Sequence, residues 1–285
     1  MAEIDSVGVL GAGTMGHGIA QVAAQAGYQT FLYDVSLELA ERGVRRVGEN
    51  LQRGMERGKV TSEQKEAALR RLSPVGALTD VARCGLVIEA IPEDLDLKKK
   101  MFRQLSESCS PQAILASNTS SLSITAIASA ASMPERVVGM HFFNPVHIMR
   151  LLEIIRADAT SDGTVEAVRQ VARRLGKETI VVRDRPGFAS SRLGVALGLE
   201  AIRMVEQGVA SAEDIDRATE LGYGYPMGPL KLGDLVGLDV RLAIADYLYR
   251  ALEEPQFEPP RILRDKVAKG ELGKKTGKGF YSWSD

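Results

Sequence analysis

The stretch VGVLGAGTMG, residues 7–16, decides how the rest of this chain is interpreted. Its first four residues predict a short buried strand, and the glycine pattern after them opens a helical run. In a strand–turn–helix of this kind, Gly11 permits the tight turn, Gly13 lets backbone N–H groups approach a pyrophosphate, and Gly16 allows close packing of helix on strand. A glycine-rich turn without a ligand is the alternative. We expect a dinucleotide to be bound by Gly11, Gly13, Thr14, Met15 and Gly16.

Asp34 supports this interpretation. It ends the next predicted strand, 18 residues after Gly16, inside one βαβ unit. A carboxylate there accepts hydrogen bonds from the ribose hydroxyls and repels a 2′-phosphate, which favours NAD over NADP as the cofactor. The alternative is a simple acid at the end of a strand.

Outward from the glycine loop, strands and helices alternate as far as residue 182. This alternation predicts an α/β fold, a Rossmann-type doubly wound and mostly parallel sheet with helices on both faces. We expect strands at 29–33, 86–91, 113–117, 137–142, 151–155 and 179–182, and helices at 36–57, 62–71, 94–108, 124–130 and 164–175.

Beyond residue 184 no convincing strand follows. We therefore expect residues 1–184 to form an NAD-binding domain and 185–285 to form a smaller all-helical domain, with a basic, Gly-rich tail at 274–281 that folds back. The helices of this second domain are expected at 190–207, 212–221, 233–252 and 261–269.

Composition limits the possible functions. The chain has 285 residues and a formal net charge of -1, which argues against a nucleic-acid or anionic-membrane binder. No apolar run approaches the roughly 20 residues of a membrane span. We expect no signal or transit peptide, because the first predicted strand begins within a few residues of Met1. Cys84 and Cys109 lack metal-ligand spacing and are interpreted as reduced thiols. We expect a cytoplasmic protein without a metal site.

His141 and Glu153 are the candidate acid–base pair. Glu153 lies inside the apolar run LLEII, where a carboxylate is expensive unless it is paired. The turn at Asn144-Pro145 allows two residues 12 apart to meet, and a carboxylate on one ring nitrogen would fix the tautomer and favour the imidazolium. The alternative is a core histidine bonded to backbone, with Glu153 on an exposed face.

Further polar residues follow the strand ends, where ligands bind in open α/β sheets. Ser120 and Ser121 follow Asn118 and are expected to begin a helix, so N-capping is the alternative to a role in the cleft. Asn144 has turn formation as its alternative role. The other histidines are assigned lesser places: His147 at the rim of a cleft, and His17 at most at the pyrophosphate edge.

These features together resemble the short-chain L-3-hydroxyacyl-CoA dehydrogenase family. The resemblance covers essentially the whole chain and rests on ordered blocks that include GAGTMGHGIAQ, VIEAIPEDLDLKKK, ASNTSSLSIT, GMHFFNPVHIMRLLE, RPGF, YPMGPLKLGDLVGLD and GKKTGKGFY. It implies hydride transfer between a (3S)-3-hydroxyacyl-CoA and NAD, with a short acyl chain such as 3-hydroxybutyryl. It also implies a homodimer formed through the helical domain.

The resemblance assigns roles to individual residues. It implies that His141 is the general base, that Glu153 orients it, that Ser120 binds the substrate oxygen, and that Asn144 supports the site. Four residues are implied at or near the cofactor or substrate: Glu93, Lys98, Asn118 and Ser191. At Ser191 the sequence departs from the family, which usually has an Asn there that contacts substrate.

Cations for the CoA phosphates are expected on the 36–60 arm, where Arg53, Arg57 and Lys59 are candidates and a solvated helical face is the alternative. Two other functions remain possible from the residues. One is a β-hydroxyacid dehydrogenase of the 6-phosphogluconate type, whose lysine motif has no match here. The other is a non-catalytic NAD(H) sensor or a crystallin-like structural protein of the same fold.

Overall fold

An eight-stranded sheet organises the first part of the chain in the computed structural model, which describes residues 4–283. The strand order is β3-β2-β1-β4-β5-β6-β7-β8, and every neighbouring pair is parallel except β6 with β7. The strands are β1 (Ser6–Leu10), β2 (Gln29–Tyr33), β3 (Leu72–Val75), β4 (Leu86–Glu89), β5 (Ile114–Ser117), β6 (Val137–Phe142), β7 (Leu151–Arg156) and β8 (Glu178–Arg183).

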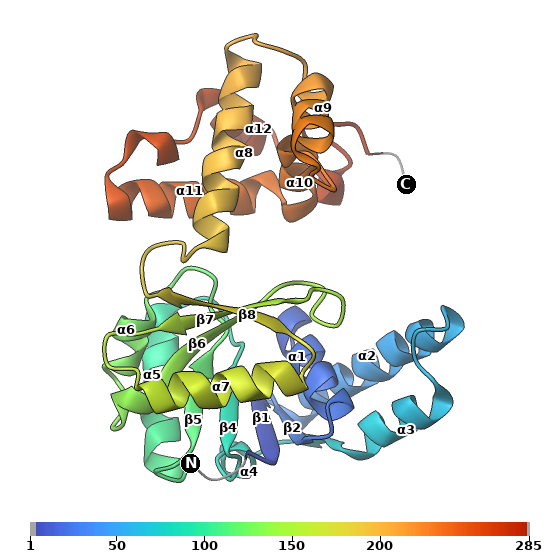
Figure 1. Cartoon of the computed structure of the whole chain (residues 1–285), viewed down its shortest axis with the longest axis vertical. Helices are drawn as coiled ribbons and strands as arrows, with labels where there is room; N and C mark the ends of the chain where they lie inside the picture. The colour runs from blue at the N-terminus through green and yellow to red at the C-terminus, as the bar shows by residue number, and fades with distance from the viewer. Residues whose placement is uncertain (1–3, 284–285) are drawn as a thin grey trace. The chain divides into compact units, whose positions relative to one another are not determined.

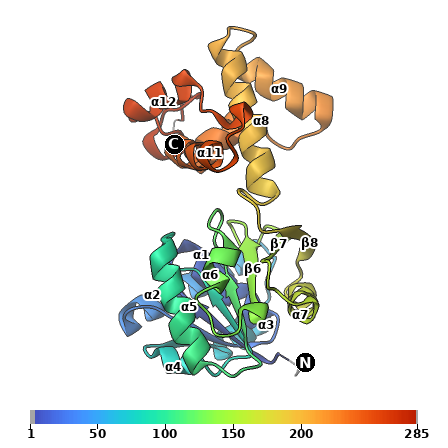
Figure 2. The same ribbon diagram turned by 90° about the vertical axis from the view of Figure 1, so that its left-hand side faces the viewer.

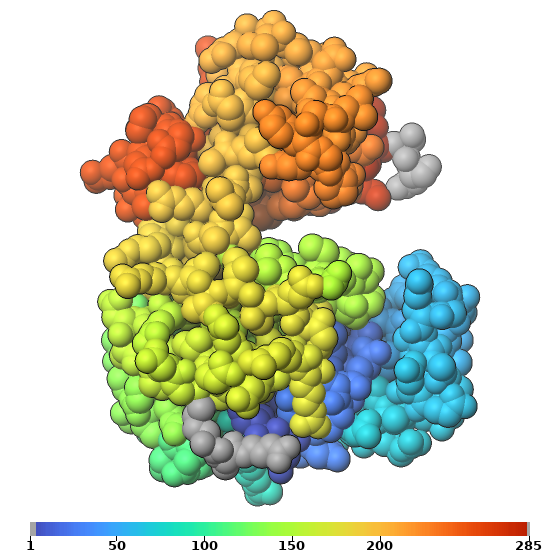
Figure 3. All heavy atoms as spheres, in the orientation of Figure 1, coloured from blue at the N-terminus to red at the C-terminus, as the bar shows by residue number. Residues whose placement is uncertain are grey.

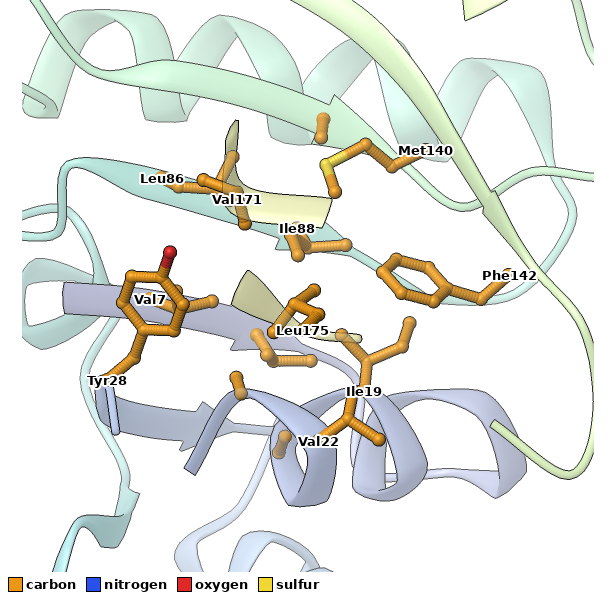
Figure 4. Close-up of a cluster of buried hydrophobic side chains, with 14 of the residues drawn as sticks. Val7, Ile19, Val22, Tyr28, Leu86, Ile88, Met140, Phe142, Val171 and Leu175 are labelled. Atoms are coloured by element: carbon orange, nitrogen blue, oxygen red, sulfur yellow. The ribbon is translucent and has the colours of Figure 1, made fainter. Parts of the chain in front are cut away.

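Helices cover both faces of this sheet, and α5 and α7 lie on opposite sides of it (Figures 1 and 2). The apolar core between the sheet and helices α1 and α7 contains Ile19, Ile88, Met140 and Val171 (Figure 4). Burying each such side chain contributes about 1.5–3 kcal/mol. The helices of this part are α1 (Thr14–Gln25), α2 (Leu37–Glu56), α3 (Ser62–Arg70), α4 (Leu78–Val81), α5 (Leu95–Ser108), α6 (Ile124–Ala128) and α7 (Asp162–Arg174), with the short 3₁₀ helix η1 (Pro134–Arg136).

The chain divides into two compact units, one ending at Arg185 and the other beginning at Pro186. The second unit is helical and has a core of its own, which includes Leu199, Leu238 and Leu248. Its elements are α8 (Ser190–Glu206), α9 (Ala212–Tyr223), α10 (Pro229–Val236), α11 (Leu238–Leu252), η2 (Pro255–Phe257), α12 (Arg261–Ala268) and η3 (Lys274–Thr276).

The C-terminal segment folds back onto α10, as the sequence predicts. The carboxylate of Asp234 is fully buried and accepts hydrogen bonds from the backbone N–H groups of Phe280 and Tyr281 and from Nε1 of Trp283, each at 2.9 Å. Three donors compensate the buried charge, so this aspartate fixes the segment in place.

The predicted fold class is confirmed, one expected helix is corrected, and one strand is present that was not expected. Residues 233–252 do not form one helix, because Gly237 adopts φ +105° and separates α10 from α11. Strand β3 is an edge strand that the sequence does not predict, since Pro74 within it weakens the strand pattern. Across residues 4–283, no helix combines the length and apolar character needed to cross a membrane.

Candidate active site

The glycine loop at the N-terminus of α1 has the shape that a dinucleotide requires. Gly11 has φ +92°, and a Cβ there would lie 2.5 Å from the Ala90 carbonyl oxygen. A Cβ on Gly16 would lie 1.6 Å from the Gly11 oxygen, whereas a Cβ on Gly13 would meet no atom within 4 Å. Gly11 and Gly16 are therefore required by the packing of the protein itself, while Gly13 faces open space.

The start of α1 also leaves its positive end available. The helix has no side-chain cap and no acidic residue in its first turn. Thr14 is exposed and Met15 half-buried, and Nδ1 of His17 lies 2.6 Å from the Gly13 carbonyl oxygen. Backbone N–H groups at an uncapped helix N-terminus favour a phosphate ligand, so these residues fit the pyrophosphate of NAD.

Asp34 lies at the end of β2, beside this loop. Its Oδ2 accepts a hydrogen bond from the Ala12 N–H and its Oδ1 accepts one from the Val35 N–H, both at 2.7 Å. Each carboxylate oxygen can accept a second hydrogen bond. The side chain thus braces the glycine loop and retains acceptors for ribose hydroxyls.

His141 and Glu153 face each other across the one antiparallel strand pair of the described sheet, β6 with β7. They are register partners, and Nδ1 of His141 lies 2.7 Å from Oε2 of Glu153. Glu153 is completely buried and His141 is 7% exposed. The carboxylate therefore has the partner that its burial requires, and the pair lies near the carboxyl end of β6.

Two lateral hydrogen-bond systems hold the segment 118–121, which follows β5. Oδ1 of Asn118 accepts a hydrogen bond of 2.9 Å from the Phe142 N–H, which ties this segment to the end of β6. Oε1 of Glu93 accepts hydrogen bonds from Oγ1 of Thr119 at 2.5 Å, from the Ser120 N–H at 3.1 Å and from Oγ of Ser121 at 3.2 Å. Glu93 thus binds three consecutive residues of the segment.

The expected helix start at Ser120 and Ser121 is wrong. Helix α6 begins at Ile124, and its N-cap is Ser123, whose Oγ accepts a hydrogen bond from the Ala126 N–H. Within the part of the chain that the structure describes, the Ser120 hydroxyl makes no hydrogen bond, although its neighbours do. A hydroxyl left in this state is available to a ligand oxygen.

A buried charge network lies behind this segment, and the sequence interpretation missed its central residue, Glu89. Oε1 of Glu89 accepts a hydrogen bond from Nζ of Lys98 at 2.5 Å, and Oε2 accepts one from Oγ of Ser117 at 2.6 Å. Lys98 is 1% exposed, and its Nζ also lies 3.4 Å from Oε2 of Glu93. The available signal was a lone acid at the end of the buried strand LVIE.

The other predicted residues lie as follows. Asn144 is exposed and is joined to Pro145 by a cis peptide bond. Arg53 and Arg57, at the end of α2, are exposed, and Arg53 donates a hydrogen bond to Oδ1 of Asn50. Ser191 is the second residue of α8 in the second unit.

His147 is not linked to a carboxylate by any described contact. Desolvation, followed by the positive charges of Lys177, His17 and Arg53, lowers its pKa. Lys177 donates to the carbonyl oxygens of Val146 and Met149 and so holds the loop that contains His147. Residues 4–283 contain no group of three or more His, Cys, Asp or Glu side chains arranged to hold a metal ion.

The glycine loop, Asp34 and the strand order define a dinucleotide-binding unit of the Rossmann class. Comparison with known proteins extends this. The model of the 3-hydroxyacyl-CoA dehydrogenase NAD binding domain matches residues 6–185, and the model of the 3-hydroxyacyl-CoA dehydrogenase C-terminal domain matches residues 187–283.

Individual proteins of this kind are similar to almost the whole of this chain. The 3-hydroxybutyryl-CoA dehydrogenase of Bradyrhizobium diazoefficiens is 44% identical over 282 residues, 99% of this chain and 96% of that protein. The 3-hydroxyadipyl-CoA dehydrogenase of Escherichia coli is 43% identical over 99% of this chain and 60% of that protein. The crystal structure of (S)-3-hydroxybutyryl-CoA dehydrogenase from Ralstonia eutropha superposes with a TM-score of 0.96 at 41% identity, covering 99% of this chain and 100% of that one.

The chain belongs to the 3-hydroxyacyl-CoA dehydrogenase family. It is an oxidoreductase that uses NAD, as its glycine loop and Asp34 predict.

Proposed function

We propose that this enzyme interconverts short-chain (3S)-3-hydroxyacyl-CoA and 3-ketoacyl-CoA, with 3-hydroxybutyryl-CoA and acetoacetyl-CoA as the favoured pair, and that His141 transfers the proton. The observation that carries the proposal is the buried contact of 2.7 Å between His141 and Glu153 at the carboxyl end of β6. The segment that carries the unpartnered Ser120 hydroxyl is tied to the same strand end through Asn118.

Bound NAD⁺ supplies the hydride acceptor when the alcohol is oxidised. The protein must remove the hydroxyl proton, and His141 does so at Nε2, since Nδ1 is held by Glu153. The carboxylate then stabilises the imidazolium and keeps the ring in one orientation. Ser120 donates a hydrogen bond to the substrate oxygen, and in the reverse direction Ser120 and the protonated His141 polarise the ketone. A general base of this kind contributes about 10²–10⁴-fold.

His141→Ala tests this assignment, and His147→Ala is its matched control six residues along the chain. We expect His141→Ala to lose most of kcat for acetoacetyl-CoA reduction while NADH binding, measured by fluorescence titration, is retained. His147→Ala should keep the parent kcat because its ring has no carboxylate to orient it. Normal turnover by His141→Ala would overturn the assignment.

The remaining cofactor and substrate contacts are part of the same proposal. Asn144 supports the site from the loop after β6, and Glu93 and Asn118 line the nicotinamide side of the cofactor. Arg53 and Arg57 bind the CoA phosphates because they are exposed cations on a predicted arm. Removing both charges (Arg53→Gln with Arg57→Gln) should raise KM for acetoacetyl-CoA and leave KM for NADH unchanged.

Ser191 is proposed as a substrate contact because it occupies the family position that usually holds an Asn. A serine reaches less far than an asparagine, so any hydrogen bond it makes to substrate is expected to involve a water molecule. Ser191→Asn should therefore retain or raise kcat/KM, and Ser191→Ala should lower it. Equal kcat/KM in all three enzymes would remove Ser191 from the site.

A preference for short acyl chains is the most specific claim that we make about the substrate. Relatives of nearly equal identity are named for 3-hydroxybutyryl-CoA and for 3-hydroxyadipyl-CoA, so identity alone does not set the acyl group. Values of kcat/KM across acyl-CoA chain lengths, measured with both NADH and NADPH, test the preference. A maximum at a long chain or at a dicarboxylic acyl group would overturn it.

Homodimerisation through the helical unit completes the proposal. Leu221 and Tyr223 of α9 are 76% and 80% exposed, and α9 (orange) forms part of the surface seen in Figure 3. Contiguous apolar patches on a surface mark interaction sites, and we propose that these two side chains belong to such a patch. Leu221→Glu with Tyr223→Glu should convert a dimer to a monomer in sedimentation, while Ile180→Glu on β8 serves as the control.

A cytoplasmic location is also proposed. Cys84 and Cys109 are buried free thiols, as expected for a protein that works in a reducing compartment.

A further inference from the structure

Glu89 is the most completely engaged acid behind the candidate site. Its side chain is fully buried at the end of β4. Oε1 accepts hydrogen bonds from Nζ of Lys98 at 2.5 Å and from the Ile91 N–H at 2.8 Å, and Oε2 accepts one from Oγ of Ser117 at 2.6 Å. One carboxylate therefore joins β4, β5 and α5 below the segment that carries Ser120.

Lys98 lies between two carboxylates and does not bind them equally. Its Nζ is 2.5 Å from Glu89 and 3.4 Å from Oε2 of Glu93, and it donates a third contact of 3.2 Å to the Ile91 carbonyl oxygen. Lys98 is 1% exposed and all three of these contacts are with protein atoms, so we expect it to influence a ligand through Glu93. Because Glu89 takes the closer position, Glu93 is attracted to Lys98 without being drawn fully against it.

Glu93 transmits this arrangement to the segment above. Its Oε1 binds Thr119, Ser120 and Ser121 at the three donor atoms described above. Ser117 connects Glu89 to the same segment by a second path, because its Oγ accepts a hydrogen bond of 3.3 Å from the Thr119 N–H. Both connections begin at Glu89 and end beside the Ser120 hydroxyl.

We propose that Glu89 is a positioning residue of the reaction, which holds Lys98 back from Glu93 so that Glu93 fixes the 119–121 segment and the Ser120 hydroxyl. The proposal rests on the role of Ser120 in the proposed function. A buried ion pair adds little to stability compared with apolar side chains of the same volume. Here we expect the pair to fix the position of the Ser120 hydroxyl. Such positioning matters because a displacement of about 1 Å can lower a rate about 10²-fold.

Glu89→Gln is the decisive variant because it keeps the shape of the side chain. The triad of Glu89, Lys98 and Glu93 then changes from two negative charges and one positive charge to one of each. The Lys98 ammonium has Glu93 as its remaining carboxylate and pulls it inward, away from the 119–121 segment. Lys98 keeps one carboxylate partner, Glu93, so its buried charge stays paired and the expected effect is on kcat.

The experiment is a double-mutant cycle of Glu89→Gln with Ser120→Ala, read as kcat and KM for acetoacetyl-CoA and as Kd for NADH. We expect Glu89→Gln to lower kcat by about tenfold or more with little change in the NADH Kd. In the Ser120→Ala background the same change should have almost no effect, since the group it positions is gone. Thr30→Val is the matched control. It removes a fully buried hydroxyl near the amino end of β2, whereas Glu89 lies at the carboxyl end of β4, and it should leave kcat unchanged.

Each outcome decides between the two proposals. Parent kcat in Glu89→Gln, or an equal loss in both backgrounds, would overturn the positioning role and leave that of Ser120 intact. Parent kcat in Ser120→Ala would overturn the proposed role of Ser120 and the positioning role with it, while His141→Ala still tests the acid–base pair. If Glu89→Gln does not fold, Ser117→Ala replaces it, because it removes the hydroxyl that joins Glu89 to the Thr119 N–H. It should show a smaller loss that also vanishes in Ser120→Ala, and parent kcat in Ser117→Ala would overturn the positioning role.

Discussion

Replacement of Glu153 by glutamine tests the acid–base pair with the least change of shape, because the side chain loses its charge and keeps its length. Glu153 is fully buried, with Oε2 2.7 Å from Nδ1 of His141. When the ring takes up a proton, opposite charges face each other with centres about 4 Å apart, which at an effective dielectric constant of about 20 corresponds to about 4 kcal/mol. Each 1.36 kcal/mol, approximately, changes a rate tenfold. Since the amide retains a dipolar contact, we expect kcat to fall by about 10²–10³-fold.

The assay follows NADH absorbance during acetoacetyl-CoA reduction, and fluorescence titration measures the Kd for NADH, which should not change. Glu178→Gln on the adjacent strand β8 is the control, because its carboxylate pairs with Arg150 while both side chains remain exposed. Exposed pairs of this kind contribute little, so kcat should stay at the parent value. A Glu153→Gln enzyme with parent kcat would refute the reasoning, because the charge of Glu153 would then play no part in proton transfer.

Three further predictions concern the glycine loop, the cofactor preference and the thiols. Gly16→Ala should abolish folding or lower the melting temperature sharply, because its Cβ would lie 1.6 Å from a carbonyl oxygen. Gly13→Ala should melt like the parent and bind NADH about tenfold more weakly, and equal melting of the two variants would contradict this. Asp34→Asn should raise KM for NADH and lower the ratio of kcat/KM with NADH to that with NADPH, and an unchanged ratio would count against the role of Asp34. Burial raises the pKa of Cys84 from 9.0 to about 12 and that of Cys109 to about 11, so at about pH 8 both should react with a thiol reagent only after unfolding. The folded-state pKa values lie above the unfolded ones, so the folded protein favours the protonated thiols. The stability that the protonated thiols contribute is fully present below about pH 9 and is lost as the pH rises toward 12. Rapid labelling of the native protein would contradict the thiol prediction.

The sequence predicts those parts of the molecule whose signals are local. The glycine loop, the alternating strands and the helical second unit all follow from short-range patterns, and the fold class is confirmed. Strand β3 was missed because Pro74 is tolerated only by virtue of its edge position, which depends on the whole sheet. The break at Gly237 was missed because apolar residues continue at helical spacing on both sides of it, and only the observed φ of +105° separates the two helices.

At the candidate site, one buried acid was paired correctly from the sequence and another was missed, and the reason is where the partner of each acid lies. Glu153 could be paired with His141 from the sequence because a turn between adjacent strands brings them into register. Glu89 also lies in a buried strand, but its partner Lys98 comes from the first turns of the next helix, so that strand register gives no indication of the contact.

The two buried acids also differ in what their partners can do. An unperturbed histidine titrates close to neutral pH, whereas an unperturbed lysine titrates far above it. A carboxylate beside histidine can therefore share in a proton transfer, as proposed for Glu153. Glu89 is instead held by Lys98, Ser117 and the Ile91 N–H together, and a carboxylate held on three sides suits the positioning role proposed for it. The partners of the two acids therefore accord with the different roles proposed for them: a single histidine for Glu153, and a set of three donors for Glu89.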